Sequence, residues 1–136
     1  MARPFDHYTD DEINAWLQAW RATRHGLEDA RMVLEIERAD LPDGAEKQRT
    51  NGQINEINQR LEAHDQLKIA FYANLVALVP PPAATVDKLT QMANRVDDLI
   101  GQAKAGDRAV QLAITIVQLF TSATGAPAKV GFPTPV

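Results

Sequence analysis

The chain has 136 residues, a formal net charge of −4 and no cysteine. This length supports one domain with a buried core, and 45% hydrophobic with 24% charged residues is ordinary for a soluble globular protein. The acidic balance argues against a general nucleic-acid binder, which needs a basic surface. The lack of cysteine excludes a disulfide framework, a thiolate nucleophile and a zinc ribbon.

The amino-terminal segment lacks the apolar centre of a secretory signal. The longest apolar run, residues 109–123, is interrupted by Gln111 and Gln118 and is shorter than the roughly 20 residues that cross a membrane. We therefore expect a soluble, cytoplasmic protein.

The first predicted helix begins at a capping box, in which Thr9 and Glu12 can bond each other's backbone amides. Large, mostly apolar residues then recur every seven positions. They are Ile13, Trp20, Leu27, Leu34 and Leu41. Pro42 and Gly44 should end this helix.

The second predicted helix runs from about Gly44 to the prolines at 80–82, with Gly52 weakening or kinking it. Its stripe recurs every three or four residues and comprises Ile54, Ile57, Leu61, His64, Lys68, Phe71, Leu75 and Leu78. Residues 67–79 are apolar nearly all round, so we expect them to be covered on several sides. The segment 53–79 is therefore the expected centre of the fold.

The third predicted helix starts with Thr85 as its cap, and its heptad phase continues from Leu89 through to Val117. One alternative is a single straight helix over 86–121, giving three long helices whose apolar end a second subunit buries. The other is a break at 104–107, with Gly106 as a left-handed stop and Asp107 as the next cap. The break is favoured because a straight helix would leave several apolar side chains wet, at about 1.5–3 kcal/mol each.

The expected fold is an all-α antiparallel bundle of four helices over residues 1–125, followed by an extended proline-containing tail at 126–136. The first two helices should project beyond it, over about 28–60, as a coiled-coil-like hairpin. The expected core comprises Ile13, Trp16, Leu17, Trp20, Phe71, Leu75, Leu78, Leu89, Met92, Val96, Leu99, Val110, Ile114, Val117 and Phe120.

A bare pair of helices would keep an exposed apolar flank, and such a flank is typical of a docking surface. The residues predicted to bind a partner there are Leu27, Arg31, Leu34, Ile54, Ile57 and Asn58.

Catalytic, cofactor and metal sites are not expected. His64 falls on the apolar stripe level with Trp20, which favours a core histidine over a metal ligand or general base. His25 and Asp29, four apart, could form a surface pair or half of a metal site, yet the chain lacks the paired Glu-x-x-His spacing of helical metal centres. Ser122 has no glycine elbow, and the glycines form no phosphate loop.

Three interpretations of residues 109–123 remain open. The favoured one is a buried helix of the bundle. The second is an oligomer seam in which Gln111 and Gln118 set the register, and the third is a segment that inserts into a membrane.

The sequence thus predicts a non-enzymatic protein–protein interaction module that binds another protein through the projecting hairpin. It does not distinguish among an inhibitor, an immunity protein, an adaptor, a chaperone and an assembly factor. The alternative is a self-assembling (homo-oligomeric) or membrane-active protein that uses residues 109–123. A helical-bundle enzyme or metal protein centred on His64 is the third hypothesis.

Overall fold

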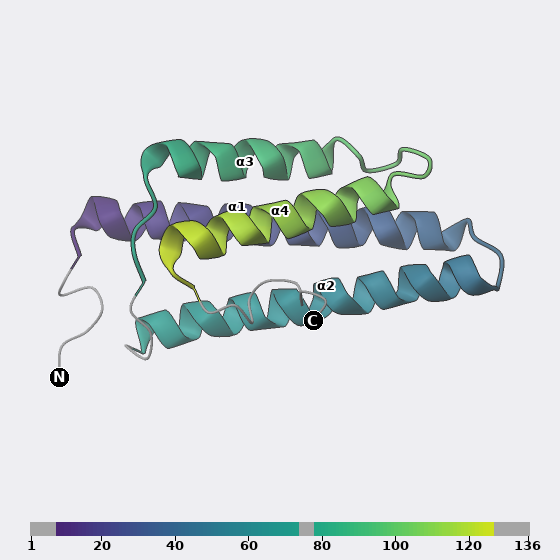
Figure 1. Cartoon of the computed structure of the whole chain (residues 1–136), viewed down its shortest axis with the longest axis horizontal. Coiled ribbons are helices and arrows are strands. Elements are labelled where there is room, and N and C mark those ends of the chain that lie inside the picture. Colours follow the sequence, from purple (N-terminus) through teal and green to yellow (C-terminus); the bar gives the residue numbers. More distant parts are fainter. Residues whose placement is uncertain (1–7, 74–77, 127–136) are drawn as a thin grey trace.

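The computed structural model describes residues 8–73 and 78–126, and these contain four α-helices and no strand (Figure 1). The helices are α1 (Asp10–Ala39), α2 (Ala45–Tyr72), α3 (Ala83–Asp97) and α4 (Gly106–Thr124). They alternate in direction, so α1 and α3 run parallel and α2 and α4 run back against them. The prediction of an all-α, four-helix bundle is confirmed.

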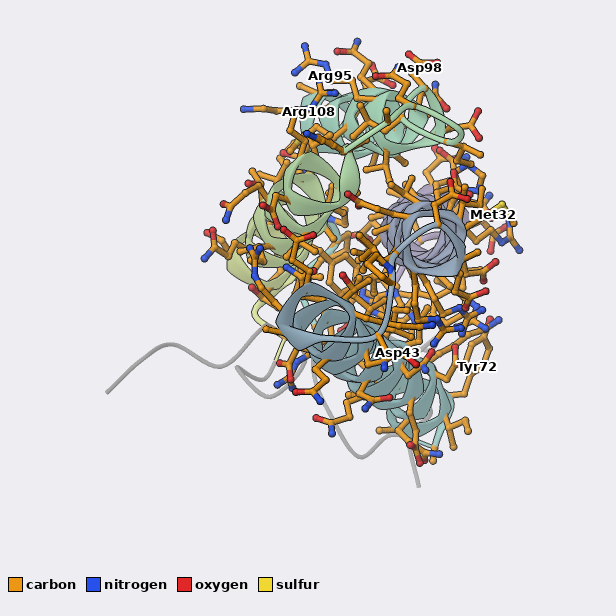
Figure 2. The ribbon with its side chains drawn as sticks, turned by 90° about the vertical axis from the view of Figure 1, so that its right-hand side faces the viewer. Met32, Asp43, Tyr72, Arg95, Asp98 and Arg108 are labelled. Atoms are coloured by element: carbon orange, nitrogen blue, oxygen red, sulfur yellow. The ribbon has the colours of Figure 1, made fainter. Side chains whose placement is uncertain are left out.

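The central element is α1, which packs against all three other helices. In the end-on view, α1 and α4 lie side by side, with α3 on one side of the pair and α2 on the other (Figure 2). The prediction that residues 53–79 form the centre is wrong for their described part, because one side of α2 faces solvent. Ile69 is 60% exposed and Tyr72 is 44% exposed. Leu75 lies outside the described residues.

The start of α1 follows the predicted capping box. The Thr9 hydroxyl accepts a hydrogen bond from the Glu12 amide at 3.1 Å, and the Glu12 carboxylate accepts one from the Thr9 amide at 2.9 Å. The predicted cap of α3 is wrong, since α3 begins at Ala83 with Pro82 as its N-cap. Proline suits this boundary because its fixed φ and missing N–H cost nothing before a helix.

The chain reverses direction between α3 and α4, which confirms the fold-back and excludes one straight helix over 86–121. The left-handed residues of this turn are Gly101 (φ 83°) and Lys104 (φ 57°), rather than the predicted Gly106. Gly106 is instead the first residue of α4, after Ala105, and Asp107 does not cap it. A Cβ at Gly106 would meet the Glu37 carboxylate, so this glycine lets α4 begin directly against α1.

Most of the apolar flank expected on the hairpin of α1 and α2 is covered, although Met32 and Ile36 stay exposed. The start of α4 reaches the level of Leu34, and Arg49 on α2 donates a hydrogen bond to Asp107 on α4 at 2.7 Å. Leu27, Leu34, Ile54 and Ile57 are all buried. The exposed flank was expected because α4 was placed only beside the amino-terminal part of α1, whereas it extends from Phe120 beside Trp16 to Gly106 beside Leu34.

The core runs the length of the bundle and includes most of the predicted residues. Ile13, Leu17, Val110 and Ile114 are the exceptions, because they are only partly buried. In α4 the buried side is made by Ala109, Ala113, Ile116, Val117 and Phe120. This agrees with the interpretation of 109–123 as a buried helix. No helix in the described part of the chain has the length and hydropathy of a membrane span.

Candidate functional site

The predicted partner-binding residues divide into two groups. Leu27, Leu34, Ile54 and Ile57 are core residues that no partner can reach in this structure. Arg31 and Asn58 are accessible, and the Arg31 guanidinium donates a 2.8 Å hydrogen bond to the Asn58 side-chain oxygen. These two polar residues hold α1 and α2 together across the surface, and binding of a partner there stays a prediction.

His64 is enclosed by aromatic rings, as its position on the stripe predicted. Its imidazole stacks on Trp20, with ring centroids 4.9 Å apart, and meets the edge of Phe120 at 5.0 Å. Two hydrogen bonds of 2.8 Å link the pair reciprocally. The Trp20 indole donates to the His64 carbonyl, and His64 Nε2 donates to the Trp20 carbonyl.

This bonding fixes the state of His64. A carbonyl can only accept, so Nε2 carries the proton and Nδ1 is bare, and Nδ1 has no hydrogen-bond partner among the described residues. Burial lowers the pKa of His64 to about 4. The imidazole is therefore neutral at pH 7 and out of reach of a substrate, which fits a core residue.

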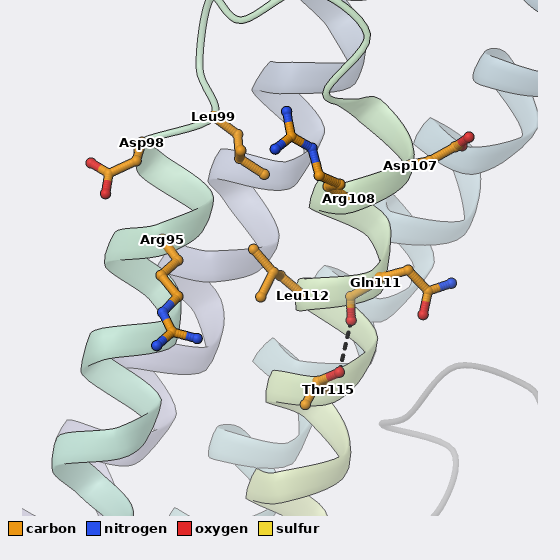
Figure 3. Close-up of a pocket in the computed structure, with 8 residues that line it drawn as sticks. All are labelled: Arg95, Asp98, Leu99, Asp107, Arg108, Gln111, Leu112 and Thr115. Atoms are coloured by element: carbon orange, nitrogen blue, oxygen red, sulfur yellow. Dashed lines mark hydrogen bonds between the residues drawn. The ribbon is translucent and has the colours of Figure 1, made fainter.

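A candidate binding surface is a groove between α3 and α4, with a cavity of about 580 Å³. Leu99 and Leu112 form its apolar floor, and Figure 3 shows them between the two helices. We call this the α3–α4 groove. Its lining residues are Arg95, Asp98, Leu99, Asp107, Arg108, Gln111, Leu112 and Thr115.

Two arginines and two aspartates line the α3–α4 groove, and they differ in direction. Arg95 on α3 and Arg108 on α4 extend on its side, whereas Asp98 and Asp107 point away from it in opposite directions (Figure 3). Within the described residues, Arg95 has no hydrogen bond or ion pair, and Arg108 has only a 3.3 Å hydrogen bond to the Gln102 side chain.

Asp107 lines the groove but is already engaged elsewhere. Its carboxylate accepts hydrogen bonds from Gln53 and from Arg49, both on α2. These bonds hold the pKa of the Asp107 carboxyl below its ordinary value. Neither groove arginine therefore has a carboxylate partner, and both guanidinium groups can bind an incoming acid.

This groove could not be predicted from the sequence. Arg95 and Arg108 lie on different helices, so only the fold-back between them brings both to one surface. The packing of α3 against α1 likewise brings Asp97 of α3 close to His25 and Asp29 of α1.

Comparison of the chain with protein-family models, with curated proteins and with solved structures found no match.

Proposed function

We propose that this protein is a non-enzymatic binding module that holds a helical, acidic segment of a partner protein in the α3–α4 groove. The observation that carries the proposal is the pair of arginines without carboxylate partners beside the apolar floor of Leu99 and Leu112. A partner helix with leucine-like anchors and flanking carboxylates would match both features.

A protein segment suits the groove better than a small molecule. The groove lies open along the outer side of two neighbouring helices, so a small apolar ligand would stay half in water. A third helix laid along α3 and α4 would bury the floor and keep its own charged edge beside the arginines. Binding should weaken with salt, because exposed charge pairs are screened within about 8 Å at physiological ionic strength.

The alternative of self-assembly through residues 109–123 has less support. The apolar residues of α4 that such a seam would use, such as Ile116 and Phe120, have no exposed surface. Gln111 and Gln118 are exposed, yet the apolar side of their helix, α4, already packs against α1 and α3.

Quantitative pull-down from the lysate of the native host tests the proposal. The double variant Arg95→Glu/Arg108→Glu should lose the partner at least about tenfold, because carboxylates would then meet carboxylates. The captured protein should contain an acidic amphipathic helix, and a peptide of that helix should bind directly.

Arg21→Glu is the matched control. Arg21 is an exposed arginine on α1, outside the groove, with no ion pair among the described residues. This variant reverses one arginine, as each of the two groove substitutions does, and should keep the partner. A partner that is retained by the groove variant, or lost equally with Arg21→Glu, would refute the proposal.

A further inference from the structure

A second cluster of side chains lies on the other edge of α3, where this helix meets α1. It consists of His25, Asp29 and Asp97, and one donor atom from each lies within 4.8 Å of the other two. His25 Nε2 is 3.0 Å from Asp29 Oδ2. An imidazole nitrogen and two carboxylate oxygens at such separations are a usual donor set for a divalent metal ion.

Asp29 supplies an independent sign that a ligand belongs here. This residue keeps only 9% of its surface exposed, and its buried Oδ2 lies 3.0 Å from His25 Nε2 without forming a hydrogen bond of good geometry among the described residues. A buried carboxylate normally has its oxygens bonded, because an unpaired buried charge is costly. Burial raises the pKa of Asp29, His25 opposes the rise, and Asp97 adds to it. The fold therefore holds two carboxylates close together with too little positive charge beside them.

The position of Asp29 and Asp97 follows from small residues one turn earlier on each helix. A Cβ on Gly26 would come within 3.7 Å of the Ala93 backbone, so α1 and α3 approach closely there. Asp29 lies three residues after Gly26, and Asp97 lies four after Ala93. Because α1 and α3 run parallel, both carboxylates reach the same level on the same edge.

We propose that His25, Asp29 and Asp97 bind one divalent transition-metal ion, best Zn²⁺, which links α1 to α3. Donors of one tetrahedral zinc ion stand at about 2.0–2.2 Å from it and hence roughly 3.3 Å from each other. The 3.0 Å separation of His25 Nε2 and Asp29 Oδ2 is close to this value. His25 and Asp97 are exposed and can turn toward the ion, while Asp29 is held by its burial.

The donor set also indicates which ions should bind poorly. Ca²⁺ takes six to eight oxygen ligands, and Mg²⁺ demands octahedral oxygen coordination with several waters retained. A site with one imidazole and two carboxylates offers too few oxygens for either ion. Three protein donors leave one position of a tetrahedral ion for water.

Isothermal titration of the metal-free protein with ZnCl₂ alone tests the proposal, together with thermal unfolding. Wild type should bind one Zn²⁺, and its Tm should rise by about 5 °C or more at a hundredfold excess over Kd. His25→Ala and Asp97→Asn, both at exposed positions that should leave the fold intact by circular dichroism, should each weaken Zn²⁺ binding at least tenfold. CaCl₂ and MgCl₂ should give no comparable shift in Tm.

Two variants serve as controls. Asp98→Asn removes the same charge one residue away, at an exposed position outside the cluster, and should bind Zn²⁺ like wild type. His7→Ala removes the third histidine of the sequence and should also retain binding. The proposal would be overturned if Asp97→Asn and Asp98→Asn were indistinguishable. Loss of Zn²⁺ binding in His7→Ala, or equal binding of Ca²⁺, would overturn it as well.

Discussion

The two sides of α1 are packed by opposite means. Toward α2, large rings fill a wide space, and Trp16 stacks on Phe71 with their centroids 4.3 Å apart. Toward α3, the helices approach so closely that Gly26 lies against Ala93. We call the side of α1 that faces α2 the wide side, because large side chains fill it. We call the side that faces α3 the narrow side, because small residues let the two helices approach closely.

The two sides also differ in how they treat buried ionisable groups. On the α2 side, His64 and Trp20 bond each other reciprocally, and the low pKa of His64 keeps it neutral. On the α3 side, Asp29 has an unbonded oxygen, and Arg95 at the other edge of α3 has no partner within the described residues. The comparison teaches that the α2 side pairs its buried polar groups with each other, whereas the edges of α3 hold charges that a ligand could engage.

The largest expected effect on stability comes from removing a large side chain between α1 and α2. Trp16→Ala should lower the free energy of unfolding by about 4 kcal/mol, because it removes a fully buried indole that contacts both Phe71 and Phe120. Urea unfolding followed by circular dichroism measures this loss. Trp16→Phe, which also removes an indole N–H without a partner, should lose clearly less. Equal losses in the two variants would show that ring volume is not what holds this side together.

The second effect concerns pH and depends on His64. Its pKa is about 4 when folded and near 6.5 when unfolded, so the unfolded chain binds more protons between these values. Stability should therefore fall by about 3 kcal/mol as the pH drops from 6.5 to 4, and this contribution changes no further below pH 4. Arg24, the charged group that also disfavours the imidazolium, acts in the same direction.

Urea midpoints across this pH range measure the effect. His64→Gln keeps a side-chain N–H for the Trp20 carbonyl but does not titrate, so its unfolding free energy should vary less with pH. The same slope in wild type and in this variant would mean that His64 does not govern acid stability.

The third effect tests the narrow side through a double-mutant cycle. A Cβ at Gly26 would meet Cδ1 of Ile116 at 2.7 Å, a contact that must be relieved by movement. Gly26→Ala should gain helix propensity and lose more through overpacking, for a net loss of about 1 kcal/mol. Ile116→Val removes that Cδ1, so Gly26→Ala should be neutral or stabilising in its background. Additive effects would show that Gly26 of α1 and Ile116 of α4 are not in close contact here.

The smallest expected effect is the change in thermal stability when Asp29, on the narrow side, loses its charge. Because its folded pKa is raised above the unfolded value of 3.8, ionised Asp29 destabilises the fold increasingly as pH rises through that window. Asp29→Asn should therefore raise the Tm slightly at pH 7, with less gain at pH 4, while abolishing Zn²⁺ binding. A variant that is less stable than wild type at pH 7 would show that the carboxylate is structural.

Local features of the fold could be predicted from the sequence because they depend on neighbouring residues. The capping box of Thr9 and Glu12 and the level pairing of Trp20 with His64 follow from spacing and helix periodicity. The reversal after α3 followed from the area that Ile116 and Phe120 must bury. Its exact place did not, since Lys104 adopts a left-handed conformation that glycine would ordinarily take.

The candidate sites could not be predicted because they join residues that are distant in the chain. Asp97 reaches His25 only where Gly26 lets two parallel helices touch. The burial of Leu34 and Ile57 was missed for a related reason, because these residues look exposed until α4 is placed along α1. Periodicity identifies the apolar side of a helix but not which neighbour covers it.

Site-specific photo-crosslinking in the native host tests most directly the central proposal, that the α3–α4 groove binds a partner protein. A benzophenone side chain at Gln111, on the rim of the α3–α4 groove, should crosslink to a partner protein, and Arg95→Glu/Arg108→Glu should abolish that product. The same group at Gln66, an exposed position on α2, should give none. A product from Gln66 with none from Gln111 would contradict the account.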